Sequence, residues 1–146
     1  MKYMTFRKVC EYAGVDYKKT IDDRANGADF ILTGANGRAI CDTDDCVATM
    51  AYARMREQGH KVRVAGTMAK RLREAMRDYP DAEQLTTVTL LNGLTFTQPA
   101  SDLDLSTGYI SGGFMLSATV FDVRNFRDLV RQAIEAEVTV IGGEDV

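Results

Sequence analysis

The sequence predicts an α+β fold, with a mostly antiparallel sheet and three to four helices. Three observations favour this class: apolar residues recur at helical spacing in several segments, other segments are β-rich, and tight turns join neighbouring strands. The chain has 146 residues, of which 45% are hydrophobic and 27% are charged. This length and composition suit one domain over residues 1–146.

The first third of the chain is predicted to form a short helix and a hairpin. An apolar stripe at helical spacing starts at Phe6, with Thr5 as its cap and Gly14 as its end. Further on, ADFILT meets GRAICD across Gly34-Ala35-Asn36-Gly37. An Asn-Gly step tolerates the positive φ of a tight turn, so this segment predicts a hairpin.

The middle of the chain is predicted as a helix, a strand and a second long helix. Asp42 or Thr43 can cap the first of these helices. Residues 60–65 alternate with period two, which predicts a strand. Gly66-Thr67 then opens the next helix, which ends before Pro80.

The last third is predicted to hold two hairpin strands, a β-rich segment, a helix and a final strand. LTTVTLL and LTFTQ flank Asn92-Gly93, a strong hairpin signal. Residues 109–121 are β-rich, with a bulge or bend expected at Gly112-Gly113. A monomer would leave strand edges unpaired there, so we expect a homo-oligomer. Asp122 caps the last helix, and residues 137–141 are predicted as a strand.

Composition argues against several classes of protein. With 18 Lys plus Arg against 21 Asp plus Glu, the net charge of −3 argues against general nucleic-acid binding. The longest apolar runs fall well short of the roughly 18 residues of a membrane span, and the N-terminus lacks the apolar core of a signal peptide. The three cysteines form no CxxC motif. We therefore expect a cytoplasmic protein with free thiols, without a disulfide framework or a Cys/His zinc site.

The sequence offers little for catalysis. Its one histidine, His60, follows a helix end in a basic neighbourhood, and GxSxG, GxxxxGK[ST] and GxGxxG motifs are absent. Asp42, Asp44 and Asp45 can be read as a metal site, but helix capping explains them. We expect a protein that is not an enzyme and that carries no metal or cofactor.

A basic segment between Arg54 and Arg77 suggests an anionic ligand. It holds eight basic and two acidic residues, a net charge of +6. In the helix predicted to open at Gly66-Thr67, Thr67, Lys70 and Arg71 can hold a phosphate on free backbone N–H groups. The alternative is that these side chains simply extend into water.

The last helix carries a second basic line. The line consists of Arg124, Arg127 and Arg131. Arg127 and Arg131 lie one turn apart, opposite the apolar stripe, and their two guanidiniums can grip a diphosphate. Pairing with Asp128 and Glu135 is the alternative. Other candidate ligand contacts come from turns, where ordinary turn chemistry is the alternative, and from an aromatic strand residue that can instead be core: Asn36, Gly37, Arg38, Ser106, Thr107 and Phe96.

The opening MKYMTFRKVCEYAG, the Asn92-Gly93 turn and the Arg127/Arg131 pair resemble the phage-encoded Thoeris anti-defence sponge family. The resemblance implies a non-enzymatic protein that sequesters a phosphate-bearing signalling nucleotide. Cyclic ADP-ribose isomers are the main ligands of that family, and some members also capture cyclic oligonucleotides. It implies Arg127, Arg131 and Asn92 as ligand contacts, and Arg24 as a candidate for a second pocket.

The competing function is a small protein-interaction inhibitor, such as an anti-CRISPR protein. In that reading the acidic surface outside the basic segment mimics nucleic acid or covers a partner's basic groove. The two functions differ in geometry: a sponge needs arginines and amides that converge in a cleft, whereas a mimic needs a broad acidic face.

Overall fold

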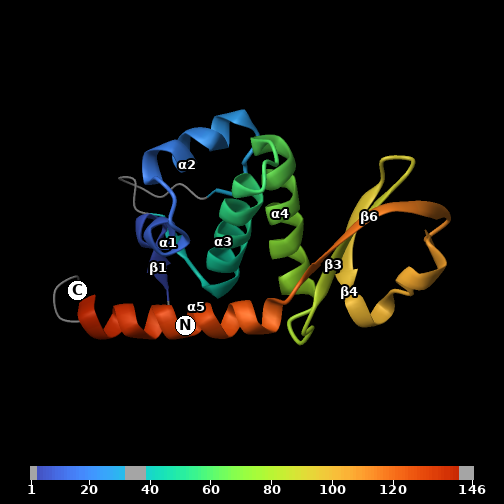
Figure 1. Ribbon diagram of the computed structural model, residues 1–146. Coiled ribbons are helices and arrows are strands. Elements are labelled where there is room, and N and C mark those ends of the chain that lie inside the picture. The colour runs from blue at the N-terminus through green and yellow to red at the C-terminus, as the bar shows by residue number, and fades with distance from the viewer. Residues whose placement is uncertain (1–2, 32–38, 142–146) are drawn as a thin grey trace.

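The computed structural model, drawn in Figure 1, describes residues 3–31 and 39–141. Five α-helices lie in these residues, one more than the upper expectation: α1 (Phe6–Ala13), α2 (Tyr17–Asp23), α3 (Thr43–Glu57), α4 (Val62–Asp78) and α5 (Val123–Ile141). The strands are β1 (Met4–Thr5), β2 (Ile40–Cys41), β3 (Leu85–Leu90), β4 (Thr95–Pro99), β5 (Tyr109–Ile110) and β6 (Gly113–Phe121). Short 3-10 turns are η1 (Arg24–Asn26), η3 (Ala100–Asp102) and η4 (Leu105–Thr107). The predicted α+β class with antiparallel pairing is confirmed.

Two helices begin where the sequence places them, because local hydrogen bonds decide both starts. The Thr5 hydroxyl accepts from the Lys8 N–H at the start of α1. At the start of α3, Asp42 accepts from the Asp45 N–H at 2.8 Å, and Asp45 accepts from the Asp42 N–H at 3.1 Å. This reciprocal pair satisfies backbone donors that a helix start leaves free.

The larger sheet has the order β4-β3-β6-β5 and projects to one side of the helices (Figure 1). The Asn92-Gly93 hairpin joins β3 to β4 as predicted. The bend expected at Gly112-Gly113 is a tight turn between β5 and β6, in which Ser111 and Gly112 both take positive φ, 51° and 83°. One β-bulge does occur, at Leu116 of β6, where the pairing with β3 shifts register between Thr89 and Leu90.

The hairpin predicted from ADFILT and GRAICD is wrong in its described part. Residues 28–31 form turns, and β2 pairs with β1, not with residues 28–31. Ala28, Phe30 and Ile31 are buried in the helical core, so packing outweighs their strand-like pattern. The turn residues Asn36, Gly37 and Arg38 lie outside the described residues.

The strand predicted at 60–65 is also wrong, because α4 begins at Val62. Alternation over six residues resembled a strand, yet the buried positions Ala65, Ala69, Leu72 and Met76 follow one helical face. Gly66 lies within that face, where a Cβ atom would approach the Ala28 Cα to 2.7 Å. This glycine permits close packing against residues 27–28 and does not open a helix.

The final strand predicted at 137–141 is wrong as well, since α5 continues to Ile141. The segment is rich in β-branched residues, which favour strands. The preceding buried positions Val123, Val130 and Ile134 set a helical period, and the helix continues through the segment.

Buried residues form two clusters. The larger joins α1, α3, α4 and α5 and includes Leu85 and Phe121 at one end of the sheet. The smaller lies on the sheet, where Val88, Leu90 and Ile110 pack with Phe96 and residues of the 3-10 turns. Among the described helices, none is both long and apolar enough to cross a membrane.

Candidate anion-binding site on α5

All three arginines of the predicted basic line on α5 border one hollow, which we call the α5 hollow. It has a volume of about 310 Å³. The remaining lining comes from the connection between α4 and β3. The full lining is Pro80, Asp81, Ala82, Glu83, Arg124, Arg127, Asp128 and Arg131.

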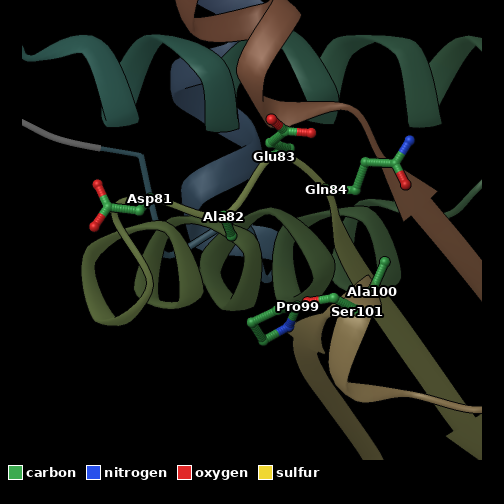
Figure 2. Close-up of a pocket in the computed structure, with 7 residues that line it drawn as sticks. All are labelled: Asp81, Ala82, Glu83, Gln84, Pro99, Ala100 and Ser101. Carbon is green, nitrogen blue, oxygen red and sulfur yellow. The ribbon is translucent and has the colours of Figure 1, made fainter.

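A second hollow of about 310 Å³ shares the same connection. Figure 2 shows its seven lining residues, which are Asp81 to Gln84 on one side and Pro99 to Ser101 on the other. The Glu83 side chain points away from Pro99 (Figure 2) and pairs with Arg124, with 3.1 Å between Oε1 and Nη1. A third hollow, of about 210 Å³, lies between Thr43 and Arg131. Arg131 therefore borders both the α5 hollow and this third one.

The structure corrects the prediction that Arg127 lies opposite the apolar stripe. This residue is only 8% exposed. Its guanidinium donates to the Pro80 carbonyl at 2.8 Å and to the Met76 carbonyl at 2.9 Å, and Nε lies 3.5 Å from Asp44 Oδ1. Helices leave their last carbonyls without partners, so Arg127 caps the end of α4 and ties it to α3.

Arg124 and Arg131 are far more accessible. Their side chains are 63% and 60% exposed, and their recorded acidic neighbours, Glu83 and Asp128, are similarly exposed. Arg131 Nη1 lies 3.6 Å from Asp128 Oδ1, so this arginine makes the local pair that the alternative interpretation expected. Exposed ion pairs contribute little, so an incoming anion can displace both carboxylates at small cost.

Acidic residues balance the charge of the α5 hollow. Asp81, Glu83 and Asp128 line it together with the three arginines. An anion that hydrogen-bonds to the two exposed guanidiniums must therefore displace their carboxylate neighbours. A diphosphate carries at least two negative charges, enough to replace both carboxylates.

The anion site predicted around Thr67 required a helix that begins at this residue, but α4 begins five residues earlier, at Val62. Thr67 lies in the second turn, where backbone N–H groups are already within the helix. Lys70 pairs with Asp29 at 3.2 Å, and Arg71 donates to the Thr95 carbonyl of β4. These contacts tie α4 to its neighbours.

The other predicted contacts do not reach the α5 hollow. Asn92 Oδ1 accepts from the Leu94 N–H at 3.0 Å within the β3–β4 turn, and Phe96 packs in the smaller core. Ser106 donates its hydroxyl and N–H to Asp104, which lowers the pKa of that carboxyl. The Thr107 hydroxyl bonds to backbone around Asp104 and Tyr109. Asn92, Ser106 and Thr107 therefore make contacts within their turns, and Phe96 makes contacts within the core.

Arg24 lies in η1 at the end of α2, and it does not line the α5 hollow. The sequence interpretation did not identify the connection at residues 80–84. The sequence does indicate a connection here, because Pro80 lies between two predicted elements and is followed by Asp81 and Glu83.

The aspartates at the start of α3 form part of a structural network. Arg73 lies 3.3 Å and Arg77 lies 3.1 Å from Asp45 Oδ1. Burial raises the pKa of Asp45, and the charge of Arg73 opposes that shift. Within residues 3–31 and 39–141, no group of three or more His, Cys, Asp or Glu residues is placed to hold a metal ion.

No family model matches this chain, and neither curated proteins nor solved structures show a significant similarity to it. Function is therefore inferred from the residues themselves and their geometry.

Proposed function

We propose that the protein binds a phosphate-bearing signalling nucleotide at the α5 hollow and holds it chemically unchanged, the role that the resemblance to Thoeris anti-defence sponges implies. The observation that carries the proposal is the convergence of Arg124, Arg127 and Arg131 on one hollow of about 310 Å³. That volume is at the lower end of small-molecule sites, which suits one phosphate group with its sugar.

The three arginines take different roles. Arg127 is held by the Met76 and Pro80 carbonyls and positions the neighbouring backbone. Arg124 and Arg131 have exposed side chains and can each donate two parallel hydrogen bonds to a phosphate. Because Arg131 also borders the hollow beside Thr43, a ligand with two phosphates can span both hollows.

Isothermal titration calorimetry tests the proposal, with cyclic ADP-ribose isomers, cyclic oligonucleotides and pyrophosphate as ligands. We expect Arg131→Ala and Arg124→Ala each to weaken binding at least about tenfold, since each loses charge-assisted hydrogen bonds of roughly 1.5 to 3 kcal/mol. The matched control is Arg63→Ala, an exposed arginine in the first turn of α4 that does not line the α5 hollow. It should bind like the wild type.

Recovery of the ligand separates binding from catalysis. After denaturation of the complex, mass spectrometry should return the nucleotide intact. Flat titrations with every ligand, equal weakening by Arg63→Ala, or recovery of a hydrolysed nucleotide would each contradict the proposal.

Inhibition of a partner protein is the second candidate function. It is favoured by large exposed apolar side chains on the sheet, notably Leu91 and Leu94 at the β3–β4 turn and Phe114 at the start of β6. Exposed apolar surface of this kind is typical of protein contacts. Flat titrations together with specific retention of a host protein, lost on Leu91→Lys with Leu94→Lys, would favour this function.

A further inference from the structure

Strand β6 has one free edge. On one side it pairs with β3 through residues 115–121, and on the other β5 covers only Gly113 and Phe114. The Met115 N–H donates to the Gly108 carbonyl, and no further strand pairing follows on that side among the described residues. Residues 116–120 are all exposed. Their outward backbone groups therefore face water.

The opposite edge of the sheet is protected, which makes the free edge of β6 distinctive. On β4, Arg71 donates to the Thr95 carbonyl, and Pro99 ends the strand. Prolines, charges and covering side chains are the usual protection of strand edges. Strand β6, GFMLSATVF, contains neither a proline nor a charged residue, and its Val120 is 50% exposed.

We propose that a second copy of this chain pairs antiparallel with the free edge of β6, around a two-fold axis at Thr119. The regular part of β6 runs from Ser117 to Phe121, between the bulge at Leu116 and the start of α5, and Thr119 is its centre. Opposed residues in a sheet point to the same face, whereas successive residues of one strand point to opposite faces. In a symmetric antiparallel pair, the two-fold axis must therefore pass between one residue and the same residue of the second copy. The result is one continuous sheet across both copies.

This register makes the edge complementary to itself. Thr87 pairs with Thr97 on one side and with Thr119 on the other, and the Thr87 and Thr97 hydroxyl oxygens are 2.8 Å apart. Pairing at Thr119 extends this row of threonines across the axis into the second copy. Threonine pairs of this kind stabilise neighbouring strands. On the other face, Ala118 of each copy lies opposite Val120 of the other and covers its exposed side chain.

Charge substitutions at the facing positions test both the contact and its register. In Ala118→Lys/Val120→Lys, two like-charge pairs face each other across the axis, so we expect the self-dissociation constant to rise at least about tenfold. In Ala118→Lys/Val120→Glu the same positions carry opposite charges, and the dimer should be retained. Leu129→Lys is the matched control, because Leu129 is an apolar residue of α5 that is 60% exposed.

Sedimentation equilibrium of the purified full chain measures the dissociation constant, and thermal melts confirm that each variant folds. A wild type that stays monomeric across the concentration range overturns the proposal. The free edge of β6 would then be a contact site for a different protein. Equal disruption by both double variants also overturns it, because the register would then be different. Dimers of the wild type, of Ala118→Lys/Val120→Glu and of Leu129→Lys, with a monomeric Ala118→Lys/Val120→Lys, support it.

Discussion

Replacement of Arg127 by alanine should destabilise the fold strongly. The substitution removes two hydrogen bonds from a buried charged donor, to the Met76 and Pro80 carbonyls, and an ion pair with Asp44. Hydrogen bonds to charged groups contribute roughly 1.5 to 3 kcal/mol each, so the free energy of unfolding should fall by about 3 to 6 kcal/mol. That is a large fraction of the roughly 5 to 15 kcal/mol of an ordinary domain.

Urea denaturation followed by circular dichroism measures this loss. Arg131→Ala is the internal control: its side chain is 60% exposed and 3.6 Å from Asp128, so its effect should stay within about 0.5 kcal/mol. Arg127→Lys should fall between the two, since a lysine keeps the charge but lacks the planar fork that reaches two carbonyls. If Arg127→Ala is no more destabilising than Arg131→Ala, Arg127 is not a structural residue and the reasoning is wrong.

Two further predictions concern the core. Gly66→Ala should lower the free energy of unfolding, measured by urea denaturation, by about 1 to 3 kcal/mol, because the new Cβ would lie 2.7 Å from the Ala28 Cα. This clash should outweigh the preference of alanine for helices. A variant more stable than the wild type would refute this prediction. Burial raises the pKa of the Cys10 and Cys46 thiols to about 11 and about 12, so the folded protein should react with thiol reagents at pH 9 far more slowly than the denatured chain. Because unfolded thiols ionise first, the free energy of unfolding should also fall between pH 9 and 11, and a flat profile there would count against it.

Features set by neighbouring residues could be predicted from the sequence. The start of α3 depends on a reciprocal bond between Asp42 and Asp45, three residues apart. The β3–β4 hairpin depends on the turn at Asn92-Gly93, and the start of α5 on Asp122, which accepts from the Asn125 N–H. Each is a short-range interaction that the residue types themselves encode.

Features set by distant packing could not be predicted. Residues 60–65 alternate in polarity, but Ala65 is buried, and the buried Gly66 packs closely against residues 27–28. That contact joins segments almost forty residues apart and decides that the chain is helical there. The burial of Arg127 has the same origin, because its two carbonyl partners lie 47 and 51 residues earlier in the chain.

The basic segment from Arg54 to Arg77 shows why a run of charge is a weak guide to a binding face. Arg73 bonds to the Phe30 carbonyl and to Asp45, and Arg77 pairs with Asp45 and with Asp42. Four other basic residues of this segment also hold neighbouring groups, namely Arg54, Arg56, Lys70 and Arg71. Charges used in this way join helices to loops and strands, and the anion site that we propose therefore uses arginines with exposed, weakly paired side chains. Arg124 and Arg131 of α5 are of that kind, although the segment around them is not markedly basic.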